Sequence, residues 1–268
     1  MDDRGIKLSP EEQPPALSII IPTFNEAPVI NQTLDAVMSI RGPVEVIVVD
    51  GGSFDETVEM VRGRGVMLIT SERGRGLQMH AGARAARGCA LWFLHADTYP
   101  SPESAGRIIE ALRDPKVVAG NFGVRFDGTR RAARFLTWLY PQLRKLGLAY
   151  GDSAIFVRRE AYEQVGGFQP FPIFEDLDLV RCLRKSGRLI HLPEIVVTSS
   201  RRFEGRSFAL TFARWSFLQL LYWLGVHPRT LGRLYAPIRG AGKKVKHNDG
   251  SSEACSEVVQ VSVESCES

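Results

Sequence analysis

Polar side chains that could bind phosphate or a metal ion follow an apolar run at 90–94, Ala-Leu-Trp-Phe-Leu. His95 and Asp97 come directly after this run. A short apolar run closed by polar residues is typical of a buried strand, and open α/β sheets bind ligands at the carboxyl ends of their strands. These residues therefore indicate a metal–phosphate site, although a strand and a turn in which Asp97 caps the next helix would have the same sequence.

Two earlier apolar runs also end in polar side chains. Residues 17–21 precede a turn that contains Asn25 and Glu26, and residues 44–49 precede Asp50. Taken alone, a helix cap would explain the first group and a tight turn the second. Three such ends at one edge of a sheet indicate a binding site instead. Neither a Gly-x-Gly-x-x-Gly nor a Walker motif follows the first run, so we do not expect a dehydrogenase.

An acidic pair, Glu175 and Asp176, begins a helix predicted at 175–186. A carboxylate can act as a general base when it lies within hydrogen-bonding reach of a substrate hydroxyl. Two acids in the first turn of a helix are also ordinary, because they complement the helix dipole. The pair by itself leaves both interpretations open.

Arginines near the predicted site are equally ambiguous. Arg73 and Arg75 flank a glycine before a helix N-terminus, where N–H and guanidinium groups can bind phosphate. Arg201 and Arg202 precede an aromatic residue and could also reach a diphosphate. Solvated loops would account for either pair.

The predicted elements alternate between strand and helix over the first hundred residues. Strands are expected at 17–21, 44–49, 66–70 and 90–94, and helices at 27–40, 55–64 and 76–87. This alternation predicts a mostly parallel central sheet with helices on both faces. Further helices are expected at 102–113, 129–148 (interrupted at Pro141), 175–186 and 207–225, and strands at 117–127, 152–158 and 189–199 (broken at Pro193).

Composition and charge indicate a basic globular protein. A hydrophobic content of 44% suffices for a sizeable core. Residues 249–268 hold five acids and no Lys or Arg, so the net charge of +4 becomes +9 without them. A basic body suits anionic partners such as nucleotide phosphates or acidic lipid, and we do not expect a nucleic acid partner. We expect a flexible lead-in at 1–16 and a disordered acidic tail at 240–268.

Several sequence features bear on the cellular location of the protein. They predict a cytoplasmic protein, either free or bound peripherally at the cytoplasmic face of a membrane. The four cysteines have no metal-ligand spacing and fit a reducing compartment, and the first residues lack an apolar signal region. Residues 207–226 are long enough to span a bilayer, but Arg214 costs roughly 2.5–3.5 kcal/mol there. We therefore favour a helix that lies on a membrane or packs on the domain. The basic, aromatic residues 129–148 would contact acidic headgroups or a lipid-like acceptor, or simply cover the domain.

Together the motifs resemble glycosyltransferase family 2. The resemblance runs through SIIIPTFNEA, VIVVDGGSFDET, GRGLQMHAGARAARG, LWFLHADT, YGDSAIFVRREAYEQVGGF, FEDLDLVRCLRKSG and SSRRFE, in this order, over roughly residues 17–205. LHADT with YGDSAIFVRR and FEDLDL looks like a bacterial-type subgroup. The resemblance implies a single Rossmann-like nucleotide-diphospho-sugar transferase domain of the A-type glycosyltransferase fold at 17–239. Its donor-binding half would be 17–100 and its acceptor half 101–239, with the apolar helix 207–225.

The resemblance also implies roles for residues on the donor side. Asp50 would accept a hydrogen bond from the uracil ring of a UDP-sugar, and Asp97 would hold a Mg²⁺ or Mn²⁺ ion that bridges the diphosphate. His95 replaces the first acid of the family's usual Asp-x-Asp motif. Imidazole suits Mn²⁺ better than Mg²⁺, but we favour a role for His95 other than metal ligand. The remaining donor-binding candidates are Thr23, Glu26, Ser53, Arg75 and Arg202.

On the acceptor side, the resemblance makes Asp176 the general base of an inverting transfer to an acceptor hydroxyl. Asp152, Ser153 and Glu175 would lie near the acceptor. The subgroup more often has Gln after the matching Asp, so the acceptor is not identified. Two other hypotheses remain: a sugar-nucleotide pyrophosphorylase, and a non-catalytic nucleotide-sugar or membrane-surface binding protein, which the substitution at His95 motivates.

Overall fold

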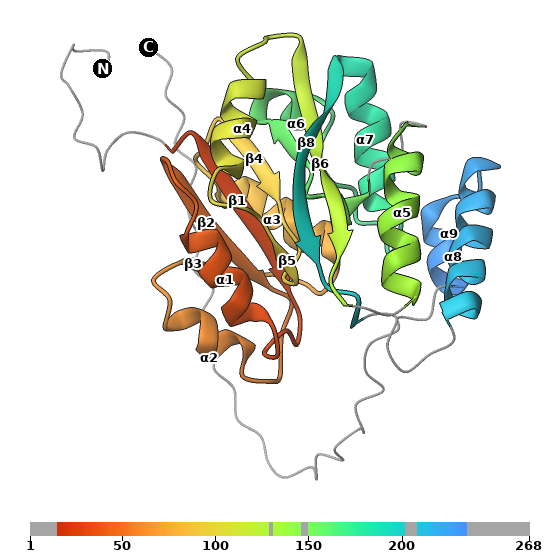
Figure 1. The fold of residues 1–268 in the computed structure, drawn as a ribbon, viewed down its shortest axis with the longest axis horizontal. Coiled ribbons are helices and arrows are strands. Elements are labelled where there is room, and N and C mark those ends of the chain that lie inside the picture. The colour runs from red at the N-terminus through yellow and green to blue at the C-terminus, as the bar shows by residue number, and fades with distance from the viewer. Residues whose placement is uncertain (1–14, 129–130, 146–149, 202–207, 235–268) are drawn as a thin grey trace, which may run out of the picture. The chain divides into compact units, whose positions relative to one another are not determined.

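A computed structural model describes residues 15–128, 131–145, 150–201 and 208–234, all within a compact unit that spans Met1–Ala236 (Figure 1). In this part of the chain, eight strands form one sheet in the order β3-β2-β1-β4-β7-β6-β8-β5. The strands are β1 (Leu17–Thr23), β2 (Val44–Asp50), β3 (Met67–Thr70), β4 (Ala90–Phe93), β5 (Thr98–Tyr99), β6 (Val117–Phe126), β7 (Phe156–Arg158) and β8 (Arg188–Thr198). The predicted segments 1–16 and 240–268 fall mostly or wholly outside the described residues.

The helices connect these strands and cover the sheet. They are α1 (Ile30–Met38), α2 (Thr57–Arg62), α3 (Arg75–Ala85), α4 (Ser104–Ala111), α5 (Arg131–Lys145), α6 (Arg159–Gln164), α7 (Glu175–Ser186), α8 (Phe208–Trp223) and α9 (Pro228–Leu234). A short 3-10 turn, η1 (Gly151–Ser153), precedes β7. None of the helices in the described ranges is long and apolar enough to cross a membrane.

The sheet is covered on both faces, as the sequence pattern predicts. Ile19 and Ile21 of β1 pack in a cluster with Leu34 of α1, whereas Ile20 packs in a second cluster with Met79 of α3. Figure 1 shows α1 in front of the sheet and α3 behind it. Because successive side chains of a strand point to opposite faces, an unbroken apolar run in β1 requires a cover on each side.

Parallel pairing places the ends of the first strands at one edge. β1 lies between β2 and β4 and is parallel to both, with Thr23 opposite Asp50 and Ile20 opposite Phe93. β7 is antiparallel to its neighbours β4 and β6, and β5 is antiparallel to β8. The observed α/β fold therefore confirms the predicted mostly parallel sheet, with antiparallel strands confined to its second half.

Several predicted boundaries are wrong. The expected strand at 152–158 begins only at Phe156, because η1 and the left-handed Ala154 (φ 52°) interrupt the extended chain. The helix expected to break at Pro141 continues through it, although proline removes one backbone hydrogen bond. Packing of the inward side chains Ala133 and Leu136 holds α5 against the sheet. The strand expected to break at Pro193 also continues through it as β8. The sequence analysis did not predict β5, α6 or α9.

Candidate active site

Asp50 shapes the loop after β2. Its side chain is buried, and Oδ2 accepts the backbone N–H groups of Gly52 (2.8 Å) and Ser53 (2.9 Å). The Ser53 hydroxyl donates to the other carboxylate oxygen, and the Thr23 hydroxyl lies 3.5 Å from it. Gly52 has a φ of 83°, a conformation that glycine adopts without strain. The predicted donor-binding residues Thr23, Asp50 and Ser53 therefore form one hydrogen-bonded group at the end of β1 and β2.

Gln78, a residue that the sequence analysis missed, ties this group to α3. Its buried side-chain amide donates to the carbonyl groups of Thr23 (2.7 Å) and Val49 (2.9 Å), which belong to neighbouring strands. A Cβ at Gly51 would lie only 3.0 Å from the same amide. Gln78 thus fixes the spacing of the two strand ends. No local sequence signal marks it, because its partners are backbone carbonyls 29 and 55 residues away.

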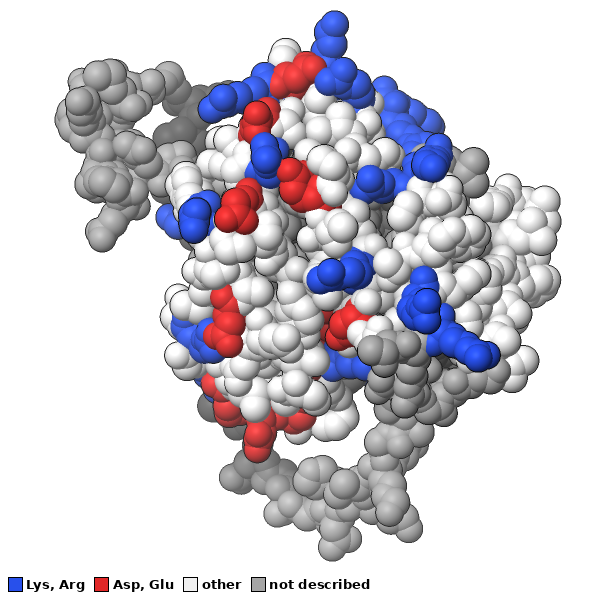
Figure 2. All heavy atoms as spheres, viewed as in Figure 1, with Lys and Arg blue, Asp and Glu red and all other residues white. Residues whose placement is uncertain are grey.

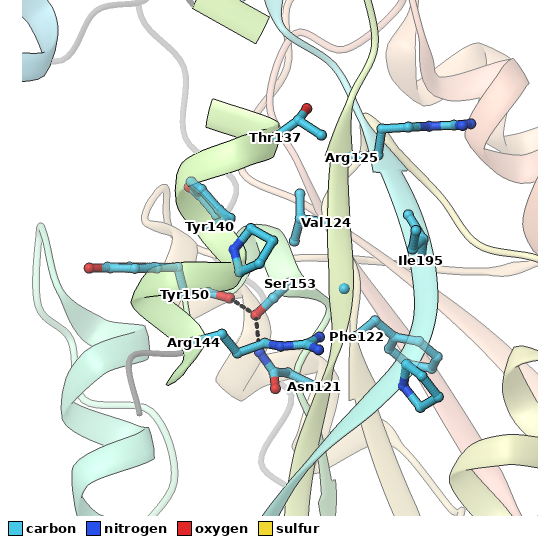
Figure 3. A pocket seen from close by; sticks show the side chains of 13 residues that line it. Asn121, Phe122, Val124, Arg125, Thr137, Tyr140, Arg144, Tyr150, Ser153 and Ile195 are labelled. Atoms are coloured by element: carbon cyan, nitrogen blue, oxygen red, sulfur yellow. Dashed lines mark hydrogen bonds between the residues drawn. The ribbon is translucent and has the colours of Figure 1, made fainter. Parts of the chain in front are cut away.

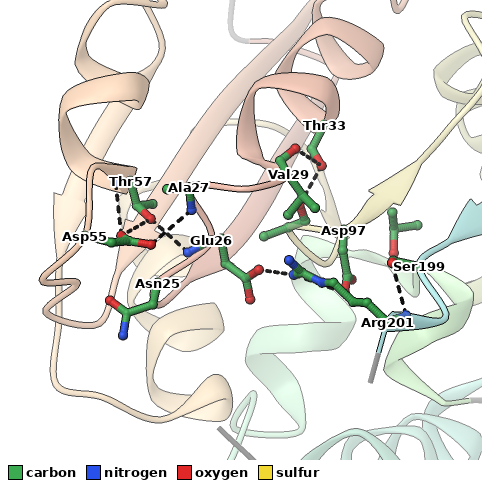
Figure 4. Close-up of polar contacts among 12 residues, drawn as sticks. Asn25, Glu26, Ala27, Val29, Thr33, Asp55, Thr57, Asp97, Ser199 and Arg201 are labelled. Atoms are coloured by element: carbon green, nitrogen blue, oxygen red, sulfur yellow. Dashed lines mark hydrogen bonds and ion pairs between the residues drawn. The ribbon is translucent and has the colours of Figure 1, made fainter. Parts of the chain in front are cut away.

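Arg201 joins two of the predicted carboxylates. Figure 4 shows its guanidinium group between Glu26, which follows β1, and Asp97, which follows β4. The same nitrogen atom forms an ion pair with Glu26 and lies 3.4 Å from Asp97. Burial disfavours the charge of Arg201, but Glu26 and Asp97 outweigh it and raise the pKa of Arg201. Its Nε atom is buried without a partner among the described residues, so the group can still donate to an anion.

His95 belongs to a different group from its neighbour Asp97. Its Nδ1 atom lies 3.0 Å from Asp152, and the Tyr140 hydroxyl donates to the other oxygen of Asp152 at 2.9 Å. The Nε2 atom of His95 is buried and has no partner among the residues that the structure describes. The predicted metal residues His95 and Asp97 therefore lie in separate polar groups, and His95 reaches a residue that was predicted for the acceptor side.

Asp176 is buried at the beginning of α7. Its two oxygens accept the N–H groups of Gly151 (2.6 Å) and Leu177 (2.8 Å). Burial and the nearby Glu175 raise the pKa of Asp176, although Arg75 and the two N–H groups act in the opposite direction. A raised pKa places this carboxyl group nearer to neutral pH, where a general base works best.

Gly151 brings His95 close to Asp176. A Cβ at this position would lie 2.9 Å from the Nε2 atom of His95 and 3.3 Å from an oxygen of Asp176. Any side chain at Gly151 would therefore enter the space between the imidazole and the carboxylate. The turn η1 thus links the end of β4 to the beginning of α7.

Glu175 and Arg75 form an ion pair that connects α7 with α3, in which the carboxylate is buried and the arginine is partly exposed. Glu175 is 2% exposed. Burial opposes the charge of Arg75, but Glu175 and Asp176 outweigh it and raise the pKa of Arg75. The structure therefore gives Arg75, a predicted donor-binding residue, a carboxylate partner within the protein. Arg202, another predicted donor-binding residue, lies outside the described ranges.

A cavity of about 340 Å³ lies beside the turn η1, between α5 and the strands β6 and β8 (Figure 3). Tyr140, Tyr150 and Ser153 line it, and the Ser153 hydroxyl accepts a hydrogen bond from Asn121 at 2.8 Å. None of its lining residues is acidic. Because Tyr140 also contacts Asp152, the cavity adjoins the group that contains His95.

The donor set at Asp97 fits a divalent cation that is bound together with phosphate. Within the described ranges, no group of three or more His, Cys, Asp or Glu side chains could hold a metal ion. Mg²⁺ usually takes one or two carboxylates and completes its shell with phosphate oxygens and water. Asp97 supplies one such carboxylate, and Glu26 lies close enough to share Arg201 with it. His95 directs one ring nitrogen to Asp152 instead.

Sequence comparisons relate the chain to known glycosyltransferases. The family described as Glycosyl transferase family 2 matches residues 18–165. An uncharacterized glycosyltransferase of Mycobacterium tuberculosis is 35% identical over 120 residues, which cover 42% of this chain and 46% of that protein. The glycosyltransferase AglE of Haloferax volcanii is 30% identical over 175 residues, 59% of this chain and 56% of that protein. The chain thus matches about half the length of these relatives.

Solved structures share the fold. A mannosyltransferase of Pyrobaculum calidifontis, in complex with GDP-Man and Mn²⁺, has a TM-score of 0.62 and 25% identity, covering 81% of this chain and 64% of that chain. Glucosyl-3-phosphoglycerate synthase of Mycobacterium tuberculosis has a TM-score of 0.55 and 19% identity, covering 80% and 81%. The S. aureus protein TarS, in complex with UDP-GlcNAc, has a TM-score of 0.56 and 18% identity, covering 72% and 60%.

Proposed function

Because the chain belongs to glycosyltransferase family 2, we propose that it transfers a sugar from a nucleotide-sugar donor to an acceptor hydroxyl, with inversion at the anomeric carbon. The observation that carries this proposal is the arrangement around Arg201 and η1. Glu26 and Asp97 share one arginine, and the turn η1 connects His95, near Asp97 in sequence, with the buried Asp176. The strand end that supplies Asp97 to Arg201 is thus connected, through His95 and η1, to a candidate general base.

The donor binds at the carboxyl ends of β1, β2 and β4 in this proposal. Thr23, Asp50 and Ser53 would hold the nucleoside, and Asp97 would hold Mg²⁺ or Mn²⁺. The cation supplies charge stabilisation for the diphosphate leaving group when it is bound. Arg201 then turns from its carboxylate partners to the diphosphate, for which its charge and its unpartnered Nε are suited. We expect a UDP-sugar, and the GDP-Man of the Pyrobaculum calidifontis enzyme makes a GDP-sugar the first alternative to test.

Asp176 acts as the general base. It takes the proton of the acceptor hydroxyl while that oxygen forms a bond to the anomeric carbon and the bond from this carbon to the diphosphate breaks. The nucleoside diphosphate leaves, and the proton remains on Asp176. Glu175 keeps Arg75 in place and helps to raise the pKa of Asp176. Asp152 and Ser153 position the acceptor from η1.

The test is release of nucleoside diphosphate from a panel of UDP- and GDP-sugars by the purified chain, with Mg²⁺ or Mn²⁺. Asp97→Asn should weaken metal-dependent donor binding by about 10–100-fold, because contacts to a charged group contribute about 1.5–3 kcal/mol. Asp114→Asn is the matched control, since Asp114 also pairs with an arginine, Arg188, but at the exposed end of β8.

Two outcomes would contradict the proposal. Metal-independent donor binding without turnover of any donor would indicate a non-catalytic binding protein. Formation of nucleoside triphosphate from nucleotide sugar and pyrophosphate would indicate a pyrophosphorylase.

A further inference from the structure

Large apolar side chains are exposed along one side of α8 and just beyond its end. Those that are 50–73% exposed are Leu210, Phe217, Leu220, Trp223 and Leu224. Their spacing of mostly three, four or seven residues places them on one side of a helix. A monomeric domain normally covers such a stripe, so it indicates an interaction surface.

The outer side of α5 extends this surface. Phe135 and Trp138 are 37% and 62% exposed. The ring of Phe135 contacts Phe208 and Phe212 of α8, with centroid distances of 5.9 and 5.6 Å. We call the exposed apolar side chains of α5 and α8, together with Leu224, the apolar face. It is continuous because these aromatic contacts join α5 to α8.

The helices that form and flank the apolar face carry positive charge and no acids. Arg131, Arg134, Arg144, Lys145, Arg214, Arg229 and Arg233 are the charged residues of α5, α8 and α9. Elsewhere the described surface mixes both signs, as in the pairs Arg64–Asp35 and Arg107–Glu110. Figure 2 shows red and blue side chains interspersed over the rest of this view, whereas the surface over α8 is free of both.

The apolar face lies on the back of a helix that also contacts the candidate site. On the inner side of α8, the Gln219 amide donates to the Tyr150 hydroxyl at 2.7 Å, and the Trp215 ring lies 5.2 Å from the Tyr150 ring. Tyr150 directly precedes Gly151, whose N–H group binds Asp176. A surface that covered the apolar face would therefore lie one helix away from the acceptor side.

We propose that the apolar face docks on the surface of an anionic lipid bilayer. Aromatic and leucine side chains enter the interface, and the exposed side chains of Arg131, Arg134 and Lys145 bind acidic headgroups. A second copy of the chain is a poorer occupant, because a symmetric contact would bring these positive charges together, and the three described helices carry no acids to pair with them. Docking goes beyond the proposed transfer reaction and does not depend on it.

The test is cosedimentation of the full chain with vesicles, without donor or metal. We expect binding to vesicles of phosphatidylcholine mixed with phosphatidylglycerol, weaker binding to pure phosphatidylcholine, and a decrease as salt is added. The double variant Phe217→Ser and Trp223→Ser should lower the binding constant at least about tenfold, because it removes two inserted side chains. Met38→Ser, which removes a comparably exposed side chain from α1, should leave binding unchanged.

A second set of variants tests how much the positive charges near the apolar face contribute to vesicle binding. Arg131→Glu with Arg134→Glu should reduce binding to the anionic vesicles, and Arg62→Glu with Arg113→Glu should reduce it less. Unchanged thermal unfolding of each variant shows that the fold is kept. The proposal is wrong if the wild-type chain binds neither vesicle, or if the serine variant binds as well as the wild type. Sedimentation velocity that shows a wild-type dimer, with the serine variant monomeric and no vesicle binding, would assign the face to a second copy.

Discussion

The half of the sheet that contains β1, β2 and β4 presents its polar residues differently from the half that contains β6, β7 and β8. In the first half the strands are parallel, and Thr23 and Asp50 are opposite each other where two strands end. In the second half β7 is antiparallel to both neighbours, and Asp152 and Asp176 lie in a 3-10 turn and at a helix start. In the first half, the regular parallel pairing of the strands places the site residues side by side at the strand ends. In the second half, the positions of the site residues depend on contacts between segments that are distant in the sequence.

Charged contacts join the two halves at the candidate site. Arg201 contacts Glu26 across 175 residues, and Arg75 contacts Glu175 across 100 residues. We propose that the first half binds the donor and that the second half transfers the proton. Variants in the first half should then weaken donor binding, and variants in the second half should lower turnover without weakening donor binding.

The largest expected effect is in the second half. Asp176→Asn removes the proposed base and should lower kcat by about 10²–10⁴-fold, the usual contribution of general acid–base catalysis. Donor binding, measured by calorimetry, should remain within a few-fold of the wild type. Asp178→Asn is the control, because Asp178 lies in the first turn of the same helix and pairs with Arg181. If Asp176→Asn loses donor binding as well as turnover, the two halves of the sheet do not have separate roles.

A change of stability is expected in the first half. Gln78→Leu removes both hydrogen bonds that its amide nitrogen donates and the one that its oxygen accepts from Gly74. The buried carbonyls of Thr23 and Val49 lose this donor, so the free energy of unfolding should fall by about 1–3 kcal/mol. Denaturant unfolding measures it. Gln142→Leu, on the outer side of α5, should change it by less than about 0.5 kcal/mol. Equal stability of the two variants would show that Gln78 does not hold the strand ends.

The smallest effect is a displacement of a pH profile. A base must be ionised to accept a proton, so kcat/KM should rise with pH through the raised pKa of Asp176. Glu175→Gln removes the negative charge that helps to raise this pKa, and the rise should therefore move to lower pH. If Arg75 leaves its place when Glu175 is replaced, Asp176 also loses a positive charge that lowers its pKa. A profile that stays in place or moves to higher pH would show that this loss outweighs the loss of the negative charge.

Much of the fold could be predicted because its signals are local. The apolar runs at 17–21, 44–49 and 90–94 became β1, β2 and β4, and the helix 175–186 was predicted with its observed ends. The parallel order followed from the alternation of strands and helices. The short β5 carries too few residues for a pattern of its own.

By itself, the sequence determined that polar residues end several buried strands, because an apolar run and the residue that closes it are adjacent in the chain. It did not determine which of these residues meet. His95 and Asp97 are two residues apart, yet the first binds Asp152 and the second Arg201. Only the tertiary structure decided this, because hydrogen bonds and ion pairs act over a few ångströms, and the packing of the sheet halves sets which distant side chains come within that range.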